Sequence, residues 1–331
     1  MKMACPLLFL LLGIGISLQA ADRRYSIIIH GGAGVQKKNW TAEQEKEVRQ
    51  TINAAALTGK KILEMGGSSL DAVETVIRML EDAPLFNAGK GAVFTNEGTN
   101  ELDASIMDGS NLKAGAVAAV TRIKNPISLA RLVMEKSKHV MLIESGAEEF
   151  AKENGMTLVD PKYFFTQRRW DELQKEKQKE QKQSQTQKKE LGTVGCIALD
   201  IHGNIAAGTS TGGTTNKRLG RVGDSPIIGA GTYANNLTCG VSCSGAGEFF
   251  MRTVAAYEVS ALMEHKNLSV EEAAKQVLAT ITKLGGDGGL IALDSHGKTT
   301  VQFNTEGMTT AYLDDAGNPV VKIFKGEFAG D

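Results

Sequence analysis

Short uninterrupted runs of apolar or small residues indicate buried strands in several parts of the chain. Residues 25–29 form a β-branched run that ends at the glycine-rich segment 30–34, and residues 113–121 form a run of small apolar residues. Two later segments, 196–207 and 289–301, each contain two such runs separated by a short turn with aspartate and glycine. Each of these later segments therefore predicts a pair of antiparallel strands.

Apolar residues spaced three and four positions apart predict amphipathic helices between these strands. Ser68 and Ser269 each precede such a pattern and have an acidic residue three positions later, which is typical of a helix N-terminus. The predicted helices cover 43–65, 68–83, a segment that begins at Asn125-Pro126, 247–265 and 269–284. Strands, helices and then strands again predict a layered α/β sandwich with antiparallel sheets.

The composition is that of a globular protein with a sizeable apolar core. The chain has 331 residues, 42% of them hydrophobic, and its 37 Lys and Arg against 38 Asp and Glu give a formal net charge of -1. This balance supplies no basic face for phosphates, so no nucleic acid is expected as a partner. The five histidines are scattered without a metal-binding spacing, so a zinc enzyme is not expected. Three of the four cysteines lie beyond the N-terminal segment and are expected as small buried residues, or with one bridge between two of them: Cys196, Cys239 and Cys243.

Residues 1–20 have the pattern of a cleaved signal peptide. Lys2 precedes an uncharged, leucine-rich run that extends to Leu18, and Gln19-Ala20-Ala21 supplies small residues for cleavage. The alternative is a retained anchor helix, for which the run is short. We therefore expect an exported protein, periplasmic or secreted, that has no membrane segment once the signal is removed.

Residues 171–190 differ from the rest of the chain because only one of these twenty side chains is apolar. Such a segment buries too little area to offset the entropy of ordering it, so a disordered linker or a solvated, frayed helix is expected. Its mixed charges argue against a nucleic-acid-binding arm.

Polar, glycine-rich clusters in the second half are candidates for chemistry. Arg221 and Asp224 lie in one such loop and can hold the carboxylate and ammonium of an amino acid, or form a surface ion pair. Ser244 and Gly245 can present donors to an oxyanion, or cap the helix that follows. No Ser-His-Asp pattern is recognisable, so the remaining covalent route is an N-terminal threonine whose own amine acts as base. That route requires a cut between Gly192 and Thr193.

Nine motifs, in order along the chain, together resemble one known family. They are His30-Gly-Gly-Ala-Gly34, Phe86-Asn-Ala-Gly89, Glu101-Leu-Asp-Ala104, Gly192-Thr-Val-Gly195, Thr209-Ser-Thr-Gly-Gly213, Asn216-Lys217, Gly220-Arg-Val-Gly-Asp-Ser-Pro226, Gly229-Ala-Gly231 and Tyr233-Ala-Asn-Asn236. From about residue 25 to 325 the chain strongly resembles the plant-type L-asparaginase and isoaspartyl peptidase family of N-terminal nucleophile (Ntn) hydrolases. The resemblance implies a four-layer αββα sandwich, cut autocatalytically at Gly192-Thr193 into an α subunit (21–192, with 171–190 as a linker) and a β subunit (193–331).

The resemblance also implies roles for individual residues. Thr193 corresponds to the nucleophile, and Thr211 to a second threonine that hydrogen-bonds near it. Ser244 and Gly245 correspond to the oxyanion hole. The family commonly has threonine in place of Ser244, so a less preorganised hydroxyl is expected here. The positions that correspond to substrate-binding or nearby residues are Arg221 for the α-carboxylate, Asp224 for the α-amine, the backbone at Gly247, and Asn87.

By the same resemblance, the substrates are L-asparagine or β-aspartyl dipeptides, and the assembly is a homodimer of processed α/β protomers. No cofactor is required, and the family often holds a structural sodium ion on backbone carbonyls of the loop near Phe86. Glycosylasparaginase is the alternative, but that enzyme usually has asparagine at the position of Gly212. A further alternative is a non-catalytic exported protein that binds amino acids through Arg221 and Asp224 and never exposes Thr193.

Overall fold

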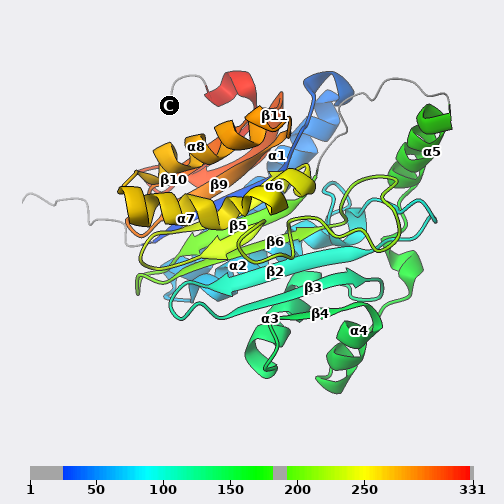
Figure 1. The fold of residues 1–331 in the computed structure, drawn as a ribbon, viewed down its shortest axis with the longest axis horizontal. Helices are drawn as coiled ribbons and strands as arrows, with labels where there is room; N and C mark the ends of the chain where they lie inside the picture. The colour runs from blue at the N-terminus through cyan, green and yellow to red at the C-terminus, as the bar shows by residue number, and fades with distance from the viewer. Residues whose placement is uncertain (1–24, 182–191, 329–331) are drawn as a thin grey trace, which may run out of the picture.

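The computed structural model describes residues 25–181 and 192–328, which form two stacked β-sheets with helices on both outer faces (Figure 1). The larger sheet has eight strands in the order β12-β11-β1-β5-β6-β2-β3-β4, and the smaller has four in the order β10-β9-β8-β7. The strands are β1 Ser26–Ala33, β2 Leu102–Asp108, β3 Ala114–Val120, β4 Met141–Ile143, β5 Val194–Leu199, β6 Ile205–Thr211, β7 Thr232–Ala234, β8 Cys239–Gly245, β9 Gly288–Asp294, β10 Thr299–Phe303, β11 Gly307–Leu313 and β12 Pro319–Phe324. The expectation of purely antiparallel sheets is wrong at one edge, because the short strand β4 runs parallel to β3.

Helices complete the four layers of the sandwich. The α-helices of the described ranges are α1 Ala42–Glu64, α2 Ser69–Asp82, α3 Pro126–Lys136, α4 Glu144–Glu153, α5 Gln167–Gln181, α6 Gly247–Thr253, α7 Ala255–Lys266 and α8 Val270–Lys283. Helices α1, α2 and α3 pack against the larger sheet, and α7 and α8 cover the smaller one (Figure 1). Short 3-10 turns lie at Lys37–Asn39, Gly89–Gly91, Pro161–Phe164 and Lys325–Phe328. The αββα sandwich predicted from the sequence is confirmed.

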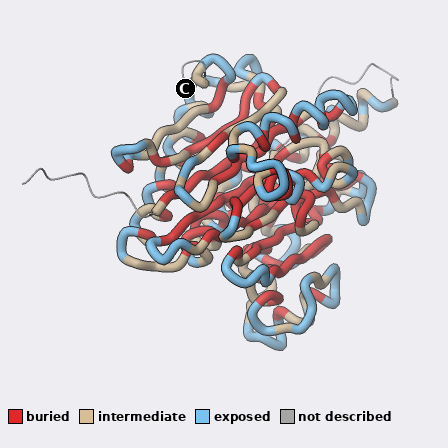
Figure 2. The backbone as a smooth tube through the Cα atoms, turned by 60° about the vertical axis from the view of Figure 1, so that its left-hand side comes forward, coloured by how far each residue is buried: buried red, intermediate tan, exposed pale blue. Residues whose placement is uncertain are grey.

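Each space between layers contains its own apolar core. Ile27 and Ile29 of β1 face the helices, whereas Ile28 between them faces the smaller sheet, because successive side chains of a strand point to opposite faces. A strand covered on both faces needs apolar residues at every position, which explains the uninterrupted run at its start. Figure 2 shows the buried strands at the centre of the molecule and the exposed residues on the outer helices and loops.

The helix boundaries follow from capping, with one correction. Ser68 and Ser269 cap α2 and α8 as predicted, and Ser269 forms a full capping box with Glu272. The single helix expected over 247–265 is wrong, because Val254 adopts a left-handed conformation (φ 49°) that ends α6 and begins α7.

The polar tract is helical in its first half. Helix α5 continues to residue 181, so residues 171–181 follow the helical alternative and not the disordered linker, and residues 182–190 lie outside the described ranges. The helix is held near its start. The Trp170 ring packs edge-on against the Phe94 ring, with the ring centroids 5.4 Å apart, and Leu173, the one apolar side chain of the tract, is fully buried. The residues that anchor the helix therefore lie mostly before residue 171. The composition of residues 171–190 could not reveal them.

The three cysteines agree with the simpler of their two expected states. Cys196, Cys239 and Cys243 are free and buried, which confirms them as small packing residues and not as partners in a bridge. Of the helices in residues 25–181 and 192–328, none has both the length and the apolar character that a membrane span requires.

Candidate active site

The polar residues of the central strands gather at one end of the space between the two sheets. Alternation along β6 turns Thr209 and Thr211 towards the smaller sheet and Ser210 towards α2, where the Ser210 hydroxyl donates to Glu81. On the facing strand β8, Cys243 joins the core under the helices, whereas Ser242 and Ser244 flank it on the opposite face. The other end of the same space is filled by an apolar cluster that includes Ile28, Ile197 and Leu293.

Three donors converge on the carbonyl oxygen of Gly192. The Thr193 hydroxyl donates to it at 2.6 Å, the Thr211 hydroxyl at 3.2 Å and the Asn87 side-chain amide at 2.8 Å. The two threonine hydroxyl oxygens lie 3.1 Å apart, and Thr193 is only 6% exposed. Hydrogen bonds to a carbonyl oxygen stabilise the negative charge that develops there when the carbon is attacked. The Gly192 carbonyl is therefore polarised beside a buried hydroxyl.

Asn87 fits closely against the chain at this point. Its amide also donates to the Gly213 carbonyl at 2.7 Å, and its carbonyl oxygen accepts from the Val93 backbone at 3.0 Å. A Cβ at position 192 would lie 2.7 Å from the Asn87 Cβ, so only glycine fits before Thr193. The structure thus brings together four of the candidate residues, Asn87, Gly192, Thr193 and Thr211.

His30 belongs to the same cluster, although the motif that contains it predicted none of these contacts. Strand β1 continues through the glycines as far as Ala33, beyond the stop expected at Ile29, and this places His30 opposite Gly195 of β5. Its Nδ1 lies 3.1 Å from the Thr193 carbonyl oxygen and its Nε2 lies 2.9 Å from the Ser242 hydroxyl. Burial lowers the pKa of His30 to about 3, so the ring is neutral near pH 7.

The Ser244 hydroxyl is held in place although serine lacks the methyl group of threonine. It is fully buried, and its oxygen accepts from the Ala33 backbone at 3.0 Å. That bond orients the oxygen and leaves the hydroxyl proton available to another acceptor. Gly245 follows at the end of β8, where a Cβ would lie 2.3 Å from the Phe250 ring. The hydrogen bond from Ala33 therefore restricts the Ser244 side chain, which the sequence alone did not predict.

The candidate residues Arg221, Asp224 and Gly247 lie together. A Cβ at position 247 would lie 2.7 Å from Asp224 Oδ1 and 3.1 Å from Arg221 Nη2. Arg221 forms an ion pair, with Nε and Nη2 donating to the two carboxylate oxygens of Glu248 at 2.9 and 3.0 Å. Asp224 is buried, its Oδ2 has no hydrogen-bond partner, and burial raises its pKa to about 6. A buried carboxylate oxygen without a donor is suited to a cationic ligand.

A buried lysine lies beneath this loop. The Lys217 ammonium, fully buried, donates to the Glu101 backbone carbonyl at 3.1 Å and lies 3.6 and 4.0 Å from carboxylate oxygens of Glu101 and Asp103. Glu101 in turn accepts from the Gly220 backbone, directly before Arg221. Burial raises the pKa of Asp103. This ionic cluster connects strand β2 to the loop that carries Arg221.

Replacement of Lys217 by methionine is expected to lower the free energy of unfolding by about 3 kcal/mol, because it leaves two buried carboxylates without their cation. Urea denaturation measures the change. Lys298→Met is the matched control, since that side chain is 59% exposed and its replacement is expected to cost under about 0.5 kcal/mol. Equal losses in the two variants would contradict the role of the buried cluster.

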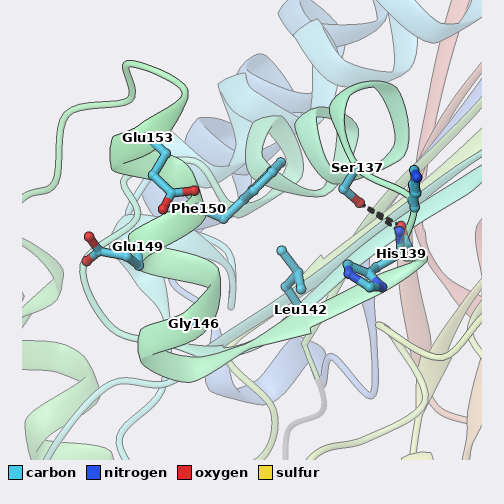
Figure 3. A pocket seen from close by; sticks show the side chains of 8 residues that line it. Ser137, His139, Leu142, Gly146, Glu149, Phe150 and Glu153 are labelled. Carbon is cyan, nitrogen blue, oxygen red and sulfur yellow. Dashed lines mark hydrogen bonds between the residues drawn. The ribbon is translucent and has the colours of Figure 1, made fainter.

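One pocket is lined by none of the candidate site residues. Figure 3 shows a hollow of about 470 Å³ between the end of α3, β4 and α4, lined by side chains that include Leu142 and Phe150 and by none of the candidate residues. Within residues 25–181 and 192–328, no group of three or more His, Cys, Asp or Glu side chains is placed to hold a metal ion.

A four-layer sandwich with hydroxyl and amide donors around one buried carbonyl is suited to an amide hydrolase. The sequence model of the Asparaginase family matches residues 23–323, and the chain belongs to this family of hydrolases. It is 49% identical over 307 residues to the isoaspartyl peptidase of Escherichia coli (strain K12), covering 90% of this chain and 96% of that protein. It is 42% identical over 290 residues to the isoaspartyl peptidase/L-asparaginase of Bos taurus, covering 87% and 93%. The corresponding Mus musculus protein is 44% identical over 286 residues, with 86% of each chain covered.

The predicted localisation is wrong. The isoaspartyl peptidases that match this chain, from Escherichia coli, Arabidopsis thaliana and Bos taurus, are cytosolic enzymes and not exported ones. Residues 1–20, the predicted signal peptide, lie outside the described ranges. The predicted export rested only on the composition of the N-terminal run, and it conflicts with the localisation of these relatives.

Proposed function

We propose that this chain is an isoaspartyl peptidase and L-asparaginase that uses Thr193 as an N-terminal nucleophile. It first cleaves its own Gly192–Thr193 bond, giving an α subunit that ends at Gly192 and a β subunit of residues 193–331. It then hydrolyses the side-chain amide of L-asparagine or of a β-aspartyl dipeptide. The observation that carries the proposal is the convergence of Thr193, Thr211 and Asn87 on the Gly192 carbonyl.

Self-cleavage begins with the hydroxyl already beside its target. The Thr193 oxygen attacks the Gly192 carbonyl carbon, and the carbonyl oxygen becomes an oxyanion held by Thr211 and Asn87. The hydroxyl proton passes to the peptide nitrogen, the C–N bond breaks, and the nitrogen becomes the free α-amine of Thr193 while an ester forms between Gly192 and the threonine oxygen. Water hydrolyses that ester, so that Gly192 ends in a carboxylate and both the hydroxyl and the amine of Thr193 are free.

Hydrolysis of substrate reuses the same hydroxyl. The Thr193 oxygen attacks the side-chain carbonyl carbon, and its α-amine accepts the proton and returns it to the departing amine. Ser244 and Gly245 supply donors for the oxyanion, supported by the bond from Ala33 that fixes the Ser244 oxygen. Water then releases aspartate from the ester. Both halves of the cycle depend on one hydroxyl.

The aspartyl half of the substrate has matching groups in the loop. The unpartnered, buried Asp224 oxygen is suited to the α-ammonium, and Arg221 to the α-carboxylate. Arg221 Nη1 lies near Gly213, whose carbonyl accepts from Asn87, and this links the loop to the nucleophile cluster. Asparagine and β-aspartyl peptides share this half and differ only in the leaving group.

Gly212 favours this function over glycosylasparaginase. A Cβ at position 212 would lie 2.6 Å from Asn87 Oδ1 and 2.8 Å from the Ala92 Cβ, so this site has no room for the asparagine usual in that enzyme. Turnover of L-asparagine, β-aspartyl-leucine and glycosylated asparagine, measured side by side, tests the proposal. We expect turnover of the first two and little of the third; preference for the glycosylated substrate would overturn it.

The loop after α2 is also suited to a sodium ion. Gly89 and Gly91 approach backbone carbonyl oxygens so closely that a Cβ would lie 2.3 Å from that of Glu81 and 2.0 Å from that of Phe86. Carbonyl oxygens are ligands for hard cations, so these would hold the ion, which would add a fixed positive charge to the loop.

The resemblance to the asparaginase family also supports a homodimer of processed α/β protomers. Light scattering of the cleaved protein would test this oligomeric state.

The pH dependence of kcat/KM is expected to have two acidic steps. The Thr193 amine must be unprotonated, and its ordinary pKa is about 8, so activity falls below that pH. Asp224 must be ionised to bind an ammonium, and its pKa is raised to about 6 by burial, so the decline becomes steeper below pH 6. A profile of kcat/KM against pH measures both steps. The second step should be absent from the residual activity of Asp224→Asn; its persistence there would assign it to another group.

A further inference from the structure

A continuous chain of buried side chains runs through the space between the sheets. It consists of His30, Ser242, Thr209, Thr232 and Ser105, which come from β1, β8, β6, β7 and β2 in that order. All five are fully buried. Five different strands therefore contribute one polar residue each to a space whose other end is apolar.

The contacts along this chain are short throughout. His30 Nε2 lies 2.9 Å from the Ser242 hydroxyl, which lies 2.7 Å from that of Thr209. The Thr209 hydroxyl lies 2.6 Å from that of Thr232, which lies 2.8 Å from that of Ser105. No member depends on solvent for a partner, and hydrogen bonds in such a setting strengthen one another.

The first contact fixes the direction of the hydrogen bonds from His30 as far as Thr232. The Thr193 carbonyl oxygen can only accept, so the neutral His30 ring must carry its proton on Nδ1 to donate to it. Nε2 is then an acceptor and takes the Ser242 proton. The Ser242 oxygen can accept from Thr209, and the Thr209 oxygen accepts from Thr232. From Thr232 to His30, every donor therefore points towards Thr193.

The other end of the chain reaches the loop that carries Asp224. The Ser105 hydroxyl lies 2.6 Å from the carbonyl oxygen of Ser225, the residue directly after Asp224, and donates its one proton either to that carbonyl or to Thr232. Thr232 also lies 3.4 Å from the same carbonyl oxygen. The chain therefore joins the backbone of the proposed nucleophile to the backbone of the proposed ammonium-binding residue.

We propose that these five side chains are positioning residues that hold the Thr193 backbone and the Asp224 loop at a fixed distance from each other. The inference rests on the proposed function, because it gives those two ends their roles. A displacement of about 1 Å between reacting groups can lower the rate about a hundredfold. Loss of a hydroxyl in the middle of the chain then reduces turnover although the residue touches neither substrate nor nucleophile.

Thr232→Val is the decisive variant, because valine keeps the shape of threonine and removes only the hydroxyl. We expect kcat to fall about tenfold with KM changed less than about twofold, and Thr232→Ser to recover most of the loss. Thr238→Val is the matched control: Thr238 is also a buried threonine, its hydroxyl bonded to Ser260 at 2.6 Å, but it lies outside the chain. An unchanged kcat in Thr232→Val, or an equal loss in Thr238→Val, would overturn the proposal.

The histidine tautomer gives a readout that needs no substrate. Nitrogen NMR of the wild-type protein should show the His30 proton on Nδ1; in Ser242→Ala the proton should stay there, because the Thr193 carbonyl still accepts it, while the Nε2 resonance shifts because that nitrogen loses its donor. A proton on Nε2 in the wild type would contradict the direction of the chain. If the wild type turned over no aspartyl amide, the proposed function would fail, while the His30 result would still decide whether the chain exists.

Discussion

Thr193→Ala is expected to remain a single uncleaved chain and to lose at least about a thousandfold in turnover of L-asparagine. The alanine has no hydroxyl to attack the Gly192 carbonyl, so the bond persists and no α-amine is released. The same change removes the nucleophile for substrate. A denaturing gel and a turnover assay on the purified variant measure the two effects together.

Thr193→Ser is the matched control for this result. Serine keeps the hydroxyl and the future amine, so this variant should still be cleaved, more slowly because its rotamer is less restricted. Efficient cleavage of Thr193→Ala at Gly192 would instead mean that another protease makes the cut. Turnover by the uncleaved alanine variant would remove Thr193 from the mechanism.

Asp224→Ala is expected to lower kcat/KM by about a thousandfold while the chain still cleaves itself. The carboxylate is buried and proposed to pair with the substrate ammonium, and removal of one partner of such a pair costs about 3 to 5 kcal/mol. Self-cleavage involves no substrate ammonium, so the fraction processed should match that of the wild type. Steady-state kinetics on fully processed protein measure the effect.

Asp224→Asn separates the charge of this residue from its shape. It should lose nearly as much as the alanine variant if the ionised carboxylate binds the ammonium. Kinetics like those of the wild type in either variant would exclude Asp224 from substrate binding. Loss of processing in both would show that the loop is needed to fold the cleavage site.

The fold was largely predictable because its elements follow local rules. The helix expected over 43–65 lies at Ala42–Glu64, and the serine caps of α2 and α8 are where the sequence predicts them. The break at Val254 could not be predicted, because nothing in the local sequence requires a left-handed residue there. The anchoring of α5 by Trp170 was equally hidden, since its partner Phe94 is distant in sequence.

The candidate site was predictable where a residue lies in a family motif, as Thr193 and Arg221 do. His30 also lies in such a motif, but its contacts with Thr193 and Ser242 come from strands more than 160 positions away in the chain. The ionic contacts of Lys217 with Glu101 and Asp103 likewise depend on sheet pairing. Residues that act across the space between sheets carry no local signal, so only the structure brings them together.

The most direct test of the central claim follows activity during maturation. Freshly purified protein would be incubated, and at each time the fraction of chains with a free Thr193 N-terminus, determined by mass spectrometry, would be compared with the rate of L-asparagine hydrolysis. The account predicts that activity rises from near zero in proportion to that fraction, with a new fragment of residues 193–331. Full activity while the Gly192–Thr193 bond is still intact would contradict it.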